Sequence, residues 1–200
     1  MRRFVSALRA VAGLGARAAR IWGAPARAAP CRPRVLLLQR PAGSGRSFVN
    51  AAELASAVRG ALERPAPRIL VACHLHALQL ADQMALFHGA DVVVGAHGAG
   101  LAWLVMLAPR GSAVLEMLPA DLPTLLYHCP ERWNAAPLSH YGGLARLAGV
   151  DHVCLRSESA TGLQGGGGPA TWGRVIGWKA RDFTADATKV RWWVRSALER

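Results

Sequence analysis

Three observations predict an α/β protein built on a Rossmann-like, doubly wound parallel sheet. First, several short segments are almost entirely apolar, as expected of strands that are covered on both faces. Second, segments with helical periodicity separate these runs, so that strands and helices alternate along the chain. Third, the chain has 200 residues, of which 52% are hydrophobic, and this suffices for one domain with a substantial core.

The predicted strands are the apolar runs that turn residues bound. In chain order they are Arg34–Gln39, Arg68–Cys73, Asp91–Gly95, Ser112–Met117 and a weaker run at His152–Leu155. The polar loop RPAGSGRS follows the first strand, and Pro109-Arg110-Gly111 precedes the fourth. Since none of these runs alternates between polar and apolar residues, a sheet buried on both faces is favoured over an exposed antiparallel one.

The predicted helices lie between and after these strands. They cover Asn50 to about Arg64, His76–His88, Gly100–Ala108, Leu138–Leu147 and Asp186–Glu199. Asn50 with Glu53 three residues later resembles an N-cap with a capping-box glutamate. Pro65 ends the first helix, and Gly89 ends the second.

The chain divides into four predicted parts. Residues 1–33 form an N-terminal helix or extension, 34–160 the Rossmann-like lobe, 161–184 a glycine-rich loop or linker, and 185–200 a closing helix. In the first part Phe4, Leu8, Val11 and Leu14 lie near one face of an amphipathic helix. Its richness in arginine and alanine also fits an organellar transit peptide, and both interpretations stay open.

The net charge of +12 does not by itself indicate a nucleic-acid partner. Lys179 and Lys189 are the only lysines in a chain rich in arginine, alanine and glycine, which is typical of a compositional bias. We therefore expect no nucleic-acid partner. We also expect no transmembrane segment, because the longest uncharged stretch, Val92 to Pro109, contains a glycine turn and reads as strand, turn and helix.

The cysteines and histidines do not predict a metal site. Cys31, Cys73, Cys129 and Cys154 have no ligand-like spacing, so isolated buried thiols are favoured, although two disulfides are possible. The stretch Cys73-His74-Leu75-His76 lacks a second ligand pair at zinc-finger spacing. No metal and no cofactor are therefore predicted.

The residues that suggest binding chemistry follow the predicted strands. Arg40 and Arg46 lie in the loop after the first strand, and His97 lies in a glycine turn after the third. Ligands of doubly wound sheets bind beyond the carboxyl ends of the strands. Two guanidinium groups and the amides of a glycine turn suit a diphosphate. Each residue also has a simpler interpretation, as a solvated charge or a turn residue bonded to backbone.

Several motifs in order resemble glycosyltransferase family 61. RVLLLQRPAGSGRSFVNAAEL matches an apolar strand followed by spaced arginines, an asparagine and an acidic residue, and Asp82-Gln83 matches an acid–glutamine pair. DVVVGAHGAGLAWLVMLAPRGSAVLEMLP matches a strand, an H-G-A-G-L turn, a P-x-G turn and a strand ending in glutamate. The similarity covers roughly Arg34 to Pro119 and departs from the family at Ser47 and Trp103.

This resemblance implies the C-terminal, donor-binding lobe of a GT-B glycosyltransferase. Such an enzyme transfers a sugar, with inversion, from a nucleotide diphosphate sugar to a hydroxyl of a glycan or glycoprotein. The residues expected to bind substrate are Arg40, Arg46, Asn50, Gly98, Ala99, Gly100 and Glu116. Arg40 and Arg46 would hold the diphosphate, and Glu116 would contact ribose or sugar hydroxyls. His97 is the catalytic candidate, as a group that stabilises the leaving diphosphate; a role as base is the alternative.

The resemblance also leaves open what the chain does alone. The family implies an additional N-terminal lobe, so we expect this chain to be a fragment, the product of a truncated gene model, or a subunit that needs a partner. The alternative function is a nucleotide-sugar-binding module that has lost catalysis. The family further implies the Golgi or ER lumen, although the chain carries no signal anchor.

Overall fold

The computed structural model confirms the α/β class. It describes residues 13–23, 32–42, 44–108, 111–120, 129–135, 139–161 and 182–200, together with Ala7 and Ala10. The central sheet contains five parallel strands in the order β2-β1-β3-β4-β5. Their bounds are β1 Arg34–Leu38, β2 Arg68–Ala72, β3 Val92–Ala96, β4 Ala113–Leu118 and β5 Asp151–Arg156. Every predicted strand is therefore present within a residue or two of its expected ends.

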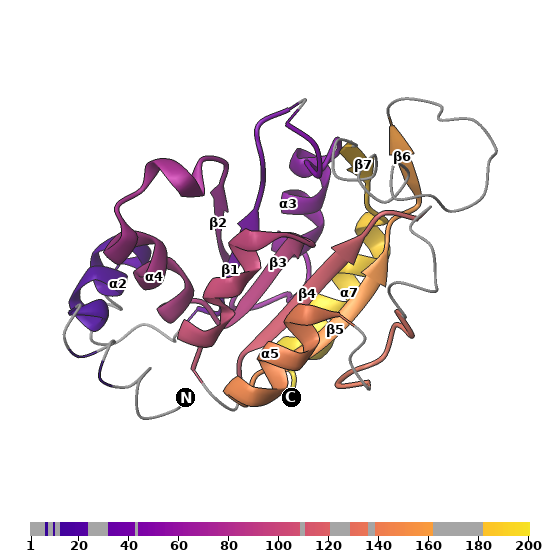
Figure 1. The fold of residues 1–200 in the computed structure, drawn as a ribbon. Coiled ribbons are helices and arrows are strands. Elements are labelled where there is room, and N and C mark those ends of the chain that lie inside the picture. Colours follow the sequence, from indigo (N-terminus) through magenta and orange to yellow (C-terminus); the bar gives the residue numbers. More distant parts are fainter. Residues whose placement is uncertain are drawn as a thin grey trace.

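Helices cover both faces of this sheet (Figure 1). One face carries α3 (Ala51–Arg59) and α7 (Ala187–Leu198). The other carries α2 (Leu14–Trp22), α4 (Leu80–His88), the 3₁₀ helix η2 (Ala99–Met106) and α5 (His140–Ala148). Successive strand residues point to opposite faces, so the continuous apolar runs supply both halves of the core.

Two predicted helices are shorter in the structure. The first ends at Arg59, where the N–H of Gly60 bonds to carbonyls of the last turn. The second is broken, because η1 (Leu75–Ala77) is followed by Leu78, whose ψ of 149° is extended, and α4 then begins at Leu80. The apolar periodicity located both helices, whereas the local backbone decided their ends.

The N-terminal helix α2 belongs to the core of the lobe. Leu14, Ala18 and Trp22 are buried against α4, and the Trp22 indole N–H donates to the carbonyl of Leu86 at 3.0 Å. Arg17 pairs with Asp82 at 3.0 Å on the same contact. This segment of the predicted N-terminal extension therefore packs with the Rossmann-like lobe. Phe4, Leu8 and Val11 lie outside the described residues.

A small second sheet joins distant parts of the chain. Strands β6 (Ser159–Thr161) and β7 (Asp182–Thr184) pair antiparallel, and Phe48 forms a bridge with Phe183 of β7. Most of the predicted linker 161–184 is outside the described residues, and its described residues are Thr161 of β6 and the three residues of β7. The bridge anchors the end of the loop that follows β1.

The predicted cap at Asn50 is wrong in its mechanism. Helix α3 does start after Asn50, but the asparagine side chain makes no capping bond to its own helix. Instead its amide donates to the carbonyl of Ala185 at 2.8 Å and its oxygen accepts from the Ala185 N–H at 3.1 Å. The amide also donates to Glu53 at 2.9 Å. Asn50 thus ties the chain after β7 to the start of α3.

The favoured interpretation of isolated thiols is wrong for two cysteines. Cys129 and Cys154 form a disulfide with a Cα–Cα distance of 5.3 Å. Cys154 lies on β5, so the bond holds the segment at Cys129 against the sheet edge. Cys73 is an exposed free thiol, and Cys31 lies outside the described residues. The spacing of the cysteines carried no information about this pairing.

Among the described residues, none of the helices combines the length and the hydrophobicity that a membrane span requires.

We expect the disulfide to stabilise the fold by about 3 kcal/mol, since it closes a loop with a sequence separation of 25 residues. Cys154→Ala should lower the free energy of unfolding by that amount in urea titrations. The control Cys73→Ala alters an exposed free thiol and should change it by less than about 0.5 kcal/mol. Equal effects of the two variants, or no effect of reductant on the wild type, would contradict the bond.

Candidate functional site

The strand order predicts where a ligand binds. From β1 the chain moves to β2 on one side, and then to β3 on the other side of β1. The loops after β1 and β3 therefore leave the sheet in opposite directions and open a crevice at their carboxyl ends. Ligands of doubly wound sheets bind at this switch point.

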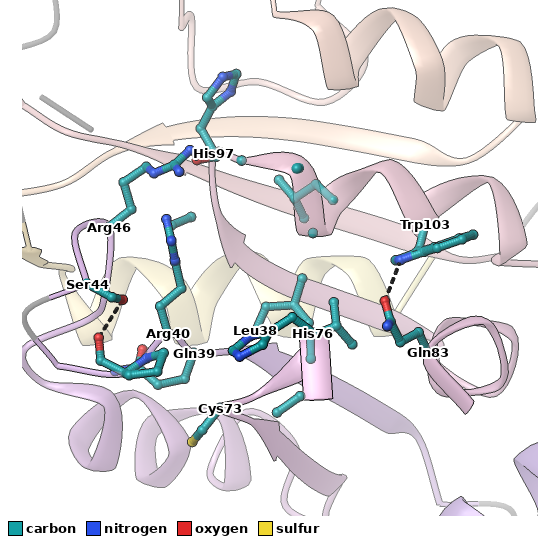
Figure 2. A pocket seen from close by; sticks show the side chains of 18 residues that line it. Leu38, Gln39, Arg40, Ser44, Arg46, Cys73, His76, Gln83, His97 and Trp103 are labelled. Carbon is teal, nitrogen blue, oxygen red and sulfur yellow. Dashed lines mark hydrogen bonds between the residues drawn. The ribbon is translucent and has the colours of Figure 1, made fainter. Parts of the chain in front are cut away.

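A cavity of about 450 Å³ lies at the switch point (Figure 2). This volume is within the range typical of small-molecule sites. The loop after β1 contributes Arg40, Ser44 and Arg46, and the turn after β3 contributes His97 to Gly100. Cys73 and His76, beyond β2, line it as well. The structure thus brings Arg40, Arg46, His97, Gly98, Ala99 and Gly100 together, as the sequence predicted.

The backbone of the β1 loop directs Arg46 toward this cavity. Gly45 and Arg46 both have left-handed φ angles, 74° and 61°. For a residue with a side chain this conformation costs about 1 kcal/mol or more, and such strained residues cluster at functional sites. The loop is held beyond Arg46 by two bonds of 3.0 Å between the Gln39 side chain and the main chain of Phe48.

The cavity carries concentrated positive charge. Burial lowers the pKa of Arg46, and the neighbouring positive charge of Arg40 lowers it further, while Tyr141 acts in the opposite direction. Among the described residues that line the cavity there is no Asp or Glu. Two nearby guanidinium groups repel one another, and an anion placed between them would relieve this repulsion. The chemistry of the cavity therefore suits a phosphate-bearing ligand.

The glycines of the turn allow close packing. A Cβ on Gly95 would lie 3.1 Å from Leu38 Cδ1 and 3.2 Å from Leu101 Cδ2, so β3 could not hold a larger residue there without displacing them. A Cβ on Gly98 would lie 2.9 Å from Nη1 of Arg46. That nitrogen donates to the carbonyl of His97 at 3.1 Å. Gly98 thus leaves the space in which the guanidinium of Arg46 rests against the turn.

The ring of His97 is turned away from the other side chains of the cavity (Figure 2). It is 8% exposed and its Nδ1 bonds to Oε1 of Glu116. The ring also makes an edge-to-face contact with Tyr141 at a centroid distance of 5.1 Å. The part of His97 that meets Arg46 is its main-chain carbonyl. The predicted catalytic role of the ring stays a prediction.

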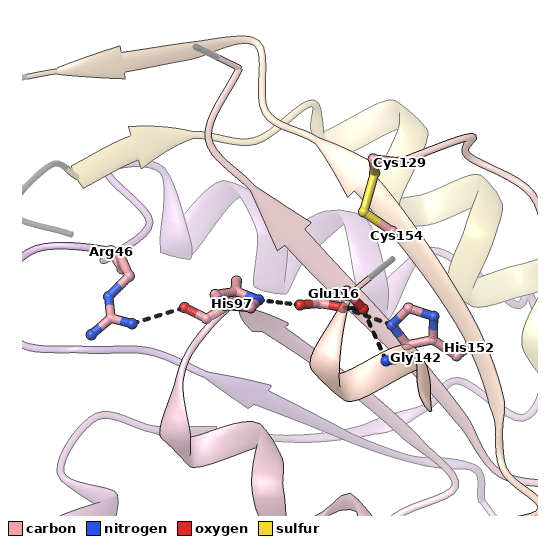
Figure 3. Close-up of polar contacts among 8 residues, drawn as sticks. Arg46, His97, Glu116, Cys129, Gly142, His152 and Cys154 are labelled. Atoms are coloured by element: carbon pink, nitrogen blue, oxygen red, sulfur yellow. Dashed lines mark hydrogen bonds and ion pairs between the residues drawn. A yellow bond between two sulfur atoms is a disulfide. The ribbon is translucent and has the colours of Figure 1, made fainter. Parts of the chain in front are cut away.

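Glu116 and Asn50 are not among the residues that line this cavity. Glu116 lies on β4 with 0% exposure, and both of its carboxylate oxygens have partners inside the protein (Figure 3). Asn50 is bonded to Ala185 and Glu53 instead. The contacts with substrate that the sequence predicted for these two residues remain untested predictions.

Two residues of the Glu116 cluster were missed in the sequence. Oε2 of Glu116 accepts from Ser139 Oγ at 2.7 Å and contacts His152 Nε2 at 2.8 Å. His152 is the register partner of Val114, which shares a face of β4 with Glu116. A histidine in an apolar strand was a visible signal in the sequence. Its partner could not be named without the order of the strands.

The ionisation of Glu116 depends on these partners. Burial alone would raise its pKa, but the hydrogen bonds from His152 and His97 outweigh it and lower the pKa to about 2. An ionised carboxylate can only accept hydrogen bonds. Nδ1 of His97 and Nε2 of His152 therefore both carry a proton in this cluster.

Trp103, which departs from the family pattern, and Gln83, which matches it, also line the cavity. Trp103 lines the cavity, and its indole N–H donates to Gln83 Oε1 at 3.1 Å. Gln83 in turn donates to the carbonyl of Leu78 at 2.9 Å. Trp103 and Gln83 thus form one wall of the cavity.

In the part of the chain that the structure describes, no group of three or more His, Cys, Asp or Glu could hold a metal ion.

The part of the chain that carries the cavity residues is similar in sequence to known proteins. The sequence profile described as Glycosyltransferase 61 matches residues 5–115, which is more than half of the chain. The chain belongs to glycosyltransferase family 61. The matched segment contains Arg40, Arg46 and the glycine turn from His97 to Gly100, and it ends one residue before Glu116.

A curated relative lies in the same family. The chain is 31% identical over 118 residues to the mouse (Mus musculus) protein named EGF domain-specific O-linked N-acetylglucosamine transferase. The match covers 59% of this family 61 chain and 19% of the relative. The chain therefore spans less than a fifth of that protein.

The buried carboxylate should make stability depend on pH. The pKa of Glu116 in the fold, about 2, lies below its ordinary value of 4.5. Its contribution is therefore present above pH 4.5 and is lost as the pH falls toward 2. The stability advantage of the wild type over Glu116→Gln should shrink by about 2 kcal/mol between pH 5 and pH 3 in urea unfolding.

The control for that experiment is Glu53→Gln, which removes a negative charge from an exposed side chain. The contribution of Glu116 is the difference between the two variants in how the free energy of unfolding changes with pH. If both variants follow the same pH profile, Glu116 is not ionised in the fold.

Proposed function

We propose that this chain forms the nucleotide-sugar-binding lobe of a family 61 glycosyltransferase, with the donor in the cavity between the ends of β1 and β3. The observation that carries the proposal is the pair Arg40 and Arg46 in a cavity whose described lining contains no carboxylate. Its position at the switch point of the sheet and the membership of the family both support it.

The donor diphosphate occupies the positive end of the cavity. Arg40 and Arg46 bind its oxygens, and the amides of Gly98, Ala99 and Gly100 at the start of η2 add oriented donors. The apolar wall of Leu75, Leu101 and Trp103 suits the flat face of a base. The base therefore lies against the apolar wall, away from the two arginines that bind the diphosphate.

The reaction is a single displacement with inversion. The acceptor hydroxyl, on a glycan or a protein, attacks the anomeric carbon of the donor sugar. The bond from that carbon to the diphosphate oxygen breaks, and the electron pair leaves with the diphosphate. Arg40 and Arg46 stabilise the negative charge that develops there. The acceptor loses its proton to a base, a role for which the turned-away ring of His97 is poorly placed.

A second candidate function is a donor-binding module without transfer. The described residues of the cavity include no Asp or Glu that could accept the proton of an acceptor. Calorimetric titration with UDP and UDP-sugars, together with a transfer assay, separates the two functions. Binding with transfer supports the enzyme, and binding without transfer supports the module. An absence of UDP binding contradicts both.

We also propose that the protein works in the lumen of the secretory pathway. The Cys129–Cys154 disulfide supports this compartment, since such bonds persist in oxidising environments and are rare in the cytosol.

Arg46→Ala should weaken UDP binding by about 1–3 kcal/mol, the contribution of a hydrogen bond to a charged group. Isothermal calorimetry on the purified chain measures the change. The control Arg59→Ala removes the same charge from an exposed position at the end of α3, and its affinity for UDP should match the wild type at moderate salt. If the two variants weaken UDP equally, Arg46 acts only through net charge.

Gly98→Ala should reduce UDP affinity while sparing stability. The added methyl group would meet the flexible end of Arg46, which can move away from the turn at little cost to the fold. Gly100→Ala is the matched control, because its Cβ would lie at an ordinary 3.5 Å from Leu75 Cδ2. We expect the Gly98 variant to lose more affinity than the Gly100 variant, at similar melting temperatures. The reverse order would mean that Arg46 is not held against this turn for binding.

A further inference from the structure

The Glu116 cluster links three elements that lie apart in the sequence (Figure 3). His97 comes from the turn after β3, His152 from β5, and Ser139 from the start of α5. The three residues are almost completely buried, with 6–7% of each residue's surface exposed. All three donate to one carboxylate, so both oxygens of Glu116 have hydrogen-bond partners inside the protein.

Ser139 connects the carboxylate to a whole helix. Its hydroxyl oxygen accepts from the N–H of Gly142 at 2.9 Å, which makes Ser139 the N-cap of α5. The same hydroxyl donates to Glu116 at 2.7 Å. Tyr141, in the first turn of α5, packs against the ring of His97. The start of α5 and the ring of His97 are therefore held in one arrangement.

The cluster reaches the cavity through the main chain of His97. The ring of His97 bonds to Glu116 on one side, while its carbonyl accepts from Nη1 of Arg46 on the other. A change in the ring position would therefore move the acceptor that holds Arg46. Gly98, the next residue, has no side chain that could hold the guanidinium in its place.

A buried carboxylate requires its hydrogen-bond partners to stay at fixed positions. Removal from water costs several kcal/mol unless the carboxylate keeps good partners, and loss of one partner leaves part of its charge uncompensated. The arrangement with all three donors in place is therefore strongly preferred over displaced ones. Residues that orient a binding group in this way commonly affect ligand binding without touching the ligand.

We propose that Glu116, Ser139 and His152 are positioning residues for the donor site, which fix His97 and through its carbonyl the guanidinium of Arg46. The proposal rests on the proposed donor-binding function and extends it. Ser139 and His152 lie beyond the segment 5–115 that defines the family match. The recognition of the diphosphate thus depends on β5 and α5, whose residues do not line the cavity.

Two buried serines provide a matched test. Ser139 and Ser157 are 6% and 5% exposed, and each accepts a backbone N–H at 2.9 Å. Only Ser139 donates to Glu116. Ser139→Ala should raise the dissociation constant for UDP about tenfold, as expected when a binding group shifts by a fraction of an ångström, whereas Ser157→Ala should leave it unchanged. Ser139→Thr keeps the hydroxyl and should restore affinity.

His152 provides an independent pair of variants. His152→Leu removes the Nε2–H that Glu116 accepts, whereas His152→Gln retains an N–H donor at a similar distance from the backbone. UDP should bind about tenfold more weakly to the leucine variant, and the glutamine variant should recover most of the loss. If His152→Leu does not fold, the serine variants carry the test alone.

Hydrogen exchange separates this proposal from the donor-binding function. The measurement follows the amides of Gly98 to Leu101 in protein without UDP. Exchange there should accelerate in Ser139→Ala and His152→Leu and match the wild type in Ser157→Ala. If wild-type protein binds no UDP, the proposed function fails, while this comparison still decides whether the cluster positions the turn. Unchanged exchange, with UDP affinity equal in the Ser139 and Ser157 variants, would overturn the positioning role.

Discussion

The buried carboxylate of Glu116 is the interaction on which the rest of the structure depends. It lies in the middle of the sheet with 0% exposure, where an ionised group is tolerated only with a full set of hydrogen bonds. Its donors come from the turn after β3, from β5 and from the start of α5. The need to satisfy one charge therefore holds the turn after β3, strand β5 and the start of α5 together.

The Glu116 cluster is connected to the cavity through His97. His97 faces Glu116 with its ring and Arg46 with its carbonyl, so the histidine acts as a spacer between the buried cluster and the arginine. Gly98 makes the contact possible because it has no Cβ. The left-handed backbone of Arg46 brings the guanidinium to the same point from the opposite loop. Repulsion between Arg40 and Arg46 then leaves the cavity suited to an anion.

The C-terminal part of the chain completes a site that the family match alone does not contain. Residues 5–115 hold both arginines and the glycine turn, but Glu116, Ser139 and His152 follow that segment. Strand β7 and the residue that follows it anchor the end of the loop after β1, through the bridge between Phe48 and Phe183 and the bonds between Asn50 and Ala185. The disulfide attaches a further segment to β5, directly beside β4. These late elements support the loops that line the cavity.

The sequence by itself determined the fold class, the positions of the strands and the loops that carry Arg40, Arg46 and the glycine turn. Apolar runs and turn residues are local signals, and parallel strands bring the loops at their carboxyl ends to one edge. Only the tertiary structure decided the partners of Glu116, the pairing of Cys129 with Cys154, and the bonds between Asn50 and Ala185. Each of these contacts joins residues far apart in the chain. They follow from the lateral order of the strands and the packing of helices over them, and local periodicity contains no information about either.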